Sequence, residues 1–149
     1  MTRRYLFALV TIVFGAASLP ARSPVDPVNR TWQGLALKGY DAVAYHAAGK
    51  PVKGSAEHTH DWKGATWRFA SRESLERFRN DPEKYAPQYG GYCAWAVSNN
   101  YTADADPEAW KIVNGKLYLN YDRSVQQMWE RERDKRIAAA DRNWPELHK

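Results

Sequence analysis

Hydrophobic and polar residues alternate along several short stretches of the chain, a spacing typical of β-strands. In residues 65–70, Trp67 and Phe69 point to one face of an extended strand, and the polar residues beside them point to the other. Residues 57–62 precede this strand, and Lys63-Gly64 separates the two stretches. A two-residue turn with glycine between two such stretches predicts a β-hairpin. A second hairpin is predicted further along the chain, with strands at residues 110–113 and 116–121 joined by Asn114-Gly115.

Helical spacing follows the first hairpin. Leu75 and Phe78 form the apolar stripe of a helix over residues 72–80, for which Ser71 is the expected N-cap. Asp81-Pro82 then begins a short helical turn, because proline suits the first position of a helix. We expect Phe78 to pack against Trp67 and Phe69 of the hairpin.

A longer helix is predicted near the C-terminus. Ser124 and Gln127 have the spacing of a capping box, and the helix would run to about Ala140. Trp144-Pro145 is the expected end of the ordered chain. The apolar face of this helix would consist of Val125, Met128, Trp129 and Ile137.

These elements predict an α+β fold, a small antiparallel sheet built from hairpins and covered by helices on one side. Residues 42–45 are expected to add a short strand. The proline-rich residues 22–36 are a leader segment, and residues 37–145 form the domain.

The N-terminus has the pattern of a secretory signal peptide. Arg3 and Arg4 precede an uncharged apolar run from Tyr5 to Leu19, too short for a comfortable membrane span of about 20 residues. We therefore expect residues 1–21 to be removed and the protein to be exported, to the periplasm or the extracellular space, with no stable membrane span after processing. An uncleaved N-terminal anchor is the alternative.

Charge and cysteine content reduce the number of possible functions. The 149-residue chain has a formal charge of +5, and without residues 1–21 it has 20 basic and 17 acidic residues, a charge of +3. Basic and acidic residues alternate between Glu130 and Arg136, as on the solvated face of a helix. The sequence has no basic run interleaved with aromatic residues, the pattern that would predict a nucleic-acid-binding surface. The single cysteine excludes an internal disulfide.

The only cysteine, Cys93, lies in an unusual stretch of glycines and aromatic residues. It is either a small buried residue of the core or a ligating or redox thiol. The Gly90-Gly91 turn is expected to bring Tyr92 and Cys93 next to the predicted strand that contains Tyr45, at a pocket. We therefore take Tyr92 and Tyr45 as candidate cofactor contacts.

Histidines supply the other candidate ligands. His58 and His60 are two residues apart in a predicted strand, so they point to the same face. With Cys93 and Asp41, they could bind copper or zinc. The alternative is a polar strand face with ordinary histidines and a turn aspartate. The many aromatic residues could also form a pocket for a small apolar or cationic ligand.

The chain resembles the YHS domain family, a small domain often found in metal-handling proteins. The residues that carry this resemblance are Trp62, Gly64, Trp67, Phe69, Ser71, Phe78, Asp81, Pro82 and Tyr85. Residues 89–94 and 115–121 resemble signature segments of its exported, single-domain branch. The resemblance covers about residues 37–144.

The resemblance also reveals a departure. The metal-binding cysteines of thiol-bearing YHS domains would fall at Ala44, Ala70 and Ser74, and none of these is cysteine here. The resemblance therefore implies a binding protein without the usual cysteine-rich zinc or copper site. The hypotheses are a metal or metal-cofactor binding protein, a structural or partner-interaction module with no metal, and a thiol-dependent enzyme.

Overall fold

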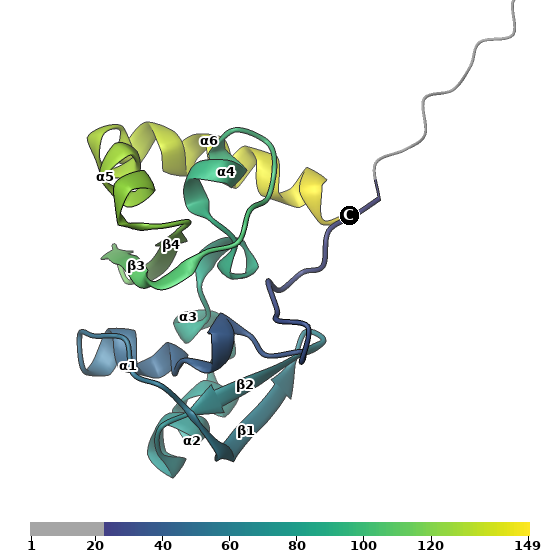
Figure 1. Cartoon of the computed structure of the whole chain (residues 1–149), viewed down its shortest axis with the longest axis vertical. Coiled ribbons are helices and arrows are strands. Elements are labelled where there is room, and N and C mark those ends of the chain that lie inside the picture. The colour runs from purple at the N-terminus through teal and green to yellow at the C-terminus, as the bar shows by residue number, and fades with distance from the viewer. Residues whose placement is uncertain (1–22) are drawn as a thin grey trace, which may run out of the picture.

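Two lobes, one above the other in Figure 1, make up the part of the chain that a computed structural model describes, residues 23–149. The first lobe contains, in chain order, η1 (Leu37–Gly39), α1 (Ala42–Ala47), β1 (Ser55–Trp62), β2 (Ala65–Phe69), α2 (Arg72–Asn80) and α3 (Pro82–Tyr85). The second lobe contains η2 (Gln88–Gly91), α4 (Ala94–Ser98), β3 (Asp106–Val113), β4 (Lys116–Asn120), α5 (Arg123–Arg131) and α6 (Arg133–Leu147). This combination confirms the predicted α+β class.

Both predicted hairpins are present, and each forms its own two-stranded antiparallel sheet. Lys63 and Gly64 both have positive φ, as do Asn114 and Gly115. This is the backbone that a two-residue hairpin turn requires, since it follows the right-handed twist of the strands. Helix α2 packs on the first hairpin and α5 on the second.

The first hairpin and α2 enclose an aromatic core. Phe78 is fully buried, and its ring centroid lies 4.9 Å from that of Trp67 and 5.0 Å from that of Phe69. The predicted packing of these three rings is therefore confirmed. Ser71 is also the N-cap of α2, since its hydroxyl accepts a hydrogen bond from Ser74 N.

Strand β4 lies between the cores of the two lobes. Leu117 and Leu119 belong to the core cluster of the first lobe, whereas Tyr118 belongs to that of the second. Alternate residues of a strand point to opposite faces, so one short strand serves both cores. It joins the two lobes through side-chain packing.

Residues 25–30 form a strap that crosses both lobes. The amide of Val25 donates to Leu147 O (3.0 Å) in the second lobe, and Val28 is buried in the first-lobe core. The amide of Asn29 donates to Gly90 O (2.8 Å). The segment predicted as a leader thus packs against the domain over much of its length. The predicted signal peptide, residues 1–21, lies outside the described residues.

Four local predictions are wrong. Residues 42–45 are helical, because the Asp41 carboxylate caps α1 by accepting from Val43 N and Ala44 N. The N-cap of α5 is Asp122 rather than Ser124.

The predicted C-terminal helix is also divided, because the chain leaves helical geometry at Glu132 between α5 and α6. Helix α6 continues past Pro145 to Leu147. Pro145 has no N–H to donate to the carbonyl of Asp141, so α6 lacks one helical hydrogen bond near its end.

Candidate functional site

The residues predicted as metal ligands lie in different parts of the fold. Asp41 is fully buried, and its second carboxylate oxygen accepts from Ala70 N at 3.0 Å. His58 and His60 are half-buried on one face of β1, and the His60 ring packs edge-on against Phe78 at 6.2 Å. Cys93 lies at the start of α4 in the second lobe. Within residues 23–149, no group of three or more His, Cys, Asp or Glu side chains could bind a metal ion.

Cys93 is a buried thiol with hydrogen-bond partners. Its sulfur accepts from Tyr121 N at 3.2 Å and lies 3.8 Å from Asn120 Oδ1, to which the thiol donates. Burial is the largest cause that raises its pKa above the ordinary value, although nearby backbone N–H groups oppose that effect. The neutral thiol is therefore the favoured form in the folded protein.

The two predicted cofactor contacts belong to separate clusters. Tyr45 is buried in the first-lobe core, where its hydroxyl donates to Pro107 O at 2.8 Å. Tyr92 packs against the second-lobe core, with its ring 5.8 Å from that of Trp144. The Gly90-Gly91 turn packs against the strap, since a Cβ on Gly90 would lie 2.1 Å from Pro27 O.

The structure brings a different set of residues together, between the lobes. We call this hollow the inter-lobe cleft; it has a volume of about 390 Å³. Its lining residues are Pro27, Val28, Trp62, Lys63, Trp67, Glu83, Ala86, Pro87, Gln88, Tyr89, Gly90, Lys116, Asp141, Trp144, Pro145 and His148. None of the six residues predicted as ligands or cofactor contacts is among them.

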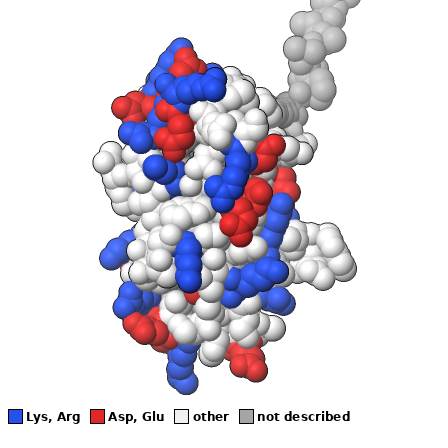
Figure 2. Space-filling model, turned by 60° about the vertical axis from the view of Figure 1, so that its left-hand side comes forward, with Lys and Arg blue, Asp and Glu red and all other residues white. Residues whose placement is uncertain are grey.

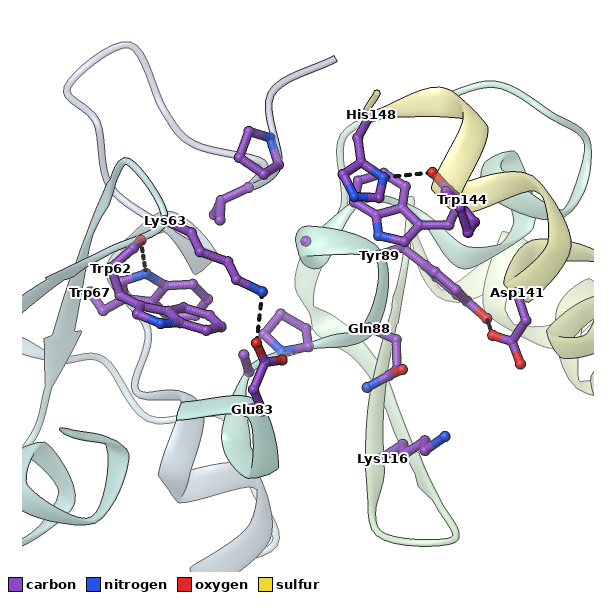
Figure 3. Close-up of a pocket in the computed structure, with 16 residues that line it drawn as sticks. Trp62, Lys63, Trp67, Glu83, Gln88, Tyr89, Lys116, Asp141, Trp144 and His148 are labelled. Atoms are coloured by element: carbon purple, nitrogen blue, oxygen red, sulfur yellow. Dashed lines mark hydrogen bonds and ion pairs between the residues drawn. The ribbon is translucent and has the colours of Figure 1, made fainter. Parts of the chain in front are cut away.

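Aromatic side chains from both lobes face this cleft. Figure 3 shows Trp62 and Trp67 on one side, with Trp144 and Tyr89 on the other. The Trp67 indole is fixed because its Nε1–H donates to Trp62 O at 3.0 Å. The Trp144 indole is stacked on the His148 ring, with centroids 4.4 Å apart. Both aromatic walls are therefore braced by neighbouring groups.

Charged groups at the cleft come in both signs. Lys63 Nζ lies 2.8 Å from Glu83 Oε1 and 4.4 Å from the centroid of the Trp62 ring. Lys116 and Asp141 add one further charge of each sign. The face in Figure 2 likewise mixes basic and acidic side chains. The cleft thus has no formal excess of charge from its Lys, Asp and Glu residues.

Tyr89 and Asp141 provide a fixed polar pair. The Tyr89 hydroxyl donates to Asp141 Oδ1 at 2.8 Å. Burial, followed by this hydrogen bond and the charge of Asp141, raises the pKa of Tyr89 well above its ordinary value. The hydroxyl therefore remains a donor, and the orientation of the Asp141 carboxylate is set by it. Asp141 is itself exposed, so its other oxygen is available to accept a hydrogen bond.

Residues 43–89 match the family model of the YHS domain, so this segment of the chain is similar to that family. The matched segment comprises most of the first lobe and the beginning of η2. The wall with Trp62 and Trp67 lies within it, as does Tyr89 of the opposite wall, whereas Lys116, Asp141 and Trp144 lie outside it. No curated protein and no solved structure matches the chain significantly. No helix within residues 23–149 is long and apolar enough to cross a membrane.

Sequence reasoning did not identify the cleft residues as a group. The abundance of tryptophan and tyrosine favoured an aromatic pocket but not its location. Trp62 and Trp144 are 82 positions apart in the sequence, and only the packing of α6 beside the strap and η2 brings them to one hollow. No local spacing signals that approach.

Proposed function

We propose that the protein is a binding module whose inter-lobe cleft holds a flat aromatic group carrying a hydrogen-bond donor. The observation that supports this proposal is the pair of braced aromatic walls, one from each lobe, around a hollow of about 390 Å³. Ligand sites of this kind typically have volumes of about 300–1,000 Å³, aromatic walls and a few oriented polar groups.

The polar groups favour a donor on the ligand. Asp141 is oriented by Tyr89 and retains an oxygen that can accept a hydrogen bond. Gln88 adds an amide, while the Glu83 carboxylate is engaged by Lys63. An aromatic ring with an N–H or O–H, such as an indole or a phenol, satisfies both the walls and the acceptor.

N-Acetyl-tryptophanamide is a neutral probe for this site. We expect calorimetry to detect its binding, and N-acetyl-leucinamide to bind at least about tenfold more weakly because it lacks the ring and the donor. Asp141→Asn should weaken binding. The oxygen of the new amide can still accept a hydrogen bond from Tyr89, but the NH2 group that replaces the second carboxylate oxygen cannot accept one from the ligand. Trp144→Leu should weaken binding by removing the ring while keeping an apolar side chain. Equal binding of both probes would contradict the proposal.

A metal ion is the second candidate ligand. The observation that favours it is the common face of His58 and His60 on β1, together with the link between YHS domains and metal handling. Two imidazoles on one face could bind copper or zinc. Copper and zinc titrations of the wild type and a His58→Ala, His60→Ala variant test this candidate. Unchanged metal affinity in the variant would exclude these histidines, and the same titration of Cys93→Ser tests the thiol.

A further inference from the structure

Trp32 is the most exposed large hydrophobic side chain in the described part of the chain, with 93% of its surface accessible. The next such residue, Tyr121, is 56% exposed. Trp32 lies in a turn of residues 30–36, which we call the Trp32 loop. An indole is costly to leave in water, and exposed tryptophans are enriched among the residues that dominate protein interfaces.

Hydrogen bonds fix the Trp32 loop. The amide of Thr31 donates to Leu35 O (2.9 Å), and that of Gly34 donates to Thr31 O (2.8 Å). The loop is also joined to β2, because Thr66 N donates to Gly34 O at 2.8 Å. Little conformational freedom is therefore left to lose when the indole is bound, which favours association.

The Trp32 loop adjoins the inter-lobe cleft. Arg30 of the loop donates to Gly64 O at 3.0 Å, in the turn beside the cleft residue Lys63. Arg30 and Lys63 also line a smaller hollow, which shares Pro27 and Val28 with the cleft. The exposed indole and the aromatic cleft are thus on neighbouring parts of the same molecule.

We infer that Trp32 of one copy inserts into the inter-lobe cleft of a second copy. This inference rests on the proposed function and names the aromatic group that the cleft holds. In this dimer the indole ring lies in the cleft between the walls that contain Trp62 and Trp144, and its Nε1–H donates to Asp141. Because the Trp32 loop and the cleft are adjacent, two copies related by a two-fold axis exchange their Trp32 side chains, and both contacts form in one closed dimer.

The dimer is expected to be weak. Each buried tryptophan contributes about 150–250 Å² of surface. Two of them, with matching areas of cleft wall, bury only about 600–1,000 Å² in total, which is below the roughly 1,200 Å² at which stable interfaces begin. We expect a dissociation constant on the order of 10 μM.

Sedimentation velocity over a concentration series tests this inference. The wild type should pass from monomer to dimer, and Trp32→Ser should remain monomeric throughout. Tyr101→Ser is the control, because it also removes an exposed aromatic side chain (44% exposed). This variant should dimerise like the wild type. Saturating N-acetyl-tryptophanamide should dissociate the wild-type dimer by occupying the cleft.

The possible failures are distinguishable. A wild type that is monomeric up to about 1 mM, or a Trp32→Ser variant that still dimerises, would overturn the inference. If Trp32→Ser nevertheless binds N-acetyl-tryptophanamide, the proposed aromatic site stands and only its occupant is wrong. If the free cleft of Trp32→Ser does not bind the probe, the proposed function fails as well. A monomer that binds phosphatidylglycerol vesicles through Trp32 would assign the loop to a membrane surface and also overturn the inference.

Discussion

The amide of Tyr121 donates a hydrogen bond to the sulfur of Cys93, at an N–S distance of 3.2 Å. The thiol in turn donates to Asn120, so the only cysteine of the chain joins α4 to the end of β4. A side chain that makes both bonds in a site 1% exposed is part of the core.

The first prediction follows from this arrangement. Cys93→Ala leaves the Tyr121 amide and one lone pair of Asn120 without a partner, and should lower the free energy of unfolding by about 1–3 kcal/mol. Cys93→Ser can keep both hydrogen bonds and should cost less. Urea denaturation compares the two variants.

A thiol-specific reagent should react slowly with the native protein and quickly in denaturant, because burial keeps the thiol neutral. Rapid reaction in the native state would contradict the placement of Cys93 in the core.

A second prediction concerns the aromatic core of the first lobe. Phe78→Ala removes a fully buried ring that contacts Trp67 and Phe69, and should cost about 3–5 kcal/mol of stability. Phe78→Leu keeps more of the volume and should cost less. Denaturant midpoints measure both changes. A loss below about 1 kcal/mol for Phe78→Ala would mean that the core repacks around the gap.

The hairpins and α2 could be predicted from the sequence because their signals are local. Lys63-Gly64 and Asn114-Gly115 specify their turns through positive φ, and Ser71 caps its helix three residues away. The class of fold follows from such elements. The sequence of residues 42–45 does not distinguish a strand from a helix, because four apolar or aromatic residues fit either structure. The deciding feature is the Asp41 carboxylate beside them, which caps the helix.

The site could not be predicted in the same way because it depends on tertiary packing. Asp41, His58 and Cys93 have side chains suited to metals, yet they lie in a helix cap, on a hairpin face and in the second lobe. The cleft arises where the strap and α6 approach the first hairpin. The match to the YHS domain model ends at Tyr89, and the cleft is lined by residues from both before and after that point in the chain.

A third prediction concerns export, which we propose from the N-terminal sequence. Arg3 and Arg4 before an uncharged apolar run should direct removal of about the first 18–21 residues. Intact-mass spectrometry of the exported protein should show the shortened chain. A mass that still includes Met1 would favour an uncleaved anchor.

A fourth prediction concerns acid stability and His46. Burial is the largest cause that lowers the pKa of His46; a hydrogen bond with the Tyr85 backbone opposes it, and the positive charge of Lys84 adds a smaller lowering effect. The folded protein therefore favours the neutral ring, and its Nε2 is buried without a hydrogen-bond partner. The contribution of His46 to the free energy of unfolding is fully present above its pKa in the unfolded chain, about 6.5. This contribution falls as the pH drops below that value, because the unfolded chain binds the proton more readily than the folded protein.

The matched variant for this prediction is His46→Phe, which keeps a ring against Tyr85 (5.4 Å between centroids in the wild type) and cannot titrate. Thermal unfolding at pH 7.5 and 5.5 should show a smaller loss of stability for the variant than for the wild type. Identical losses would mean that His46 does not contribute to the acid sensitivity.

The last prediction separates backbone strain from close packing at the strap. Gly90 and Gly49 have nearly the same positive φ, +61° and +66°, so alanine at either position should incur the cost of left-handed geometry, about 1–2 kcal/mol. A Cβ at Gly49 would have no neighbour within 4 Å, whereas one at Gly90 would lie 2.1 Å from Pro27 O. Gly90→Ala must therefore also displace the strap and weaken the hydrogen bond from Asn29 N to Gly90 O.

We expect Gly90→Ala to destabilise the protein by at least about 1–3 kcal/mol more than Gly49→Ala, the usual cost of overpacking. Urea denaturation of both variants measures this difference, and hydrogen exchange should show faster exchange of the Asn29 amide in Gly90→Ala alone. Equal stabilities would show that the strap moves aside without loss. Because Pro27, Val28 and Gly90 also line the inter-lobe cleft, a displaced strap should weaken N-acetyl-tryptophanamide binding in Gly90→Ala and leave it unchanged in Gly49→Ala.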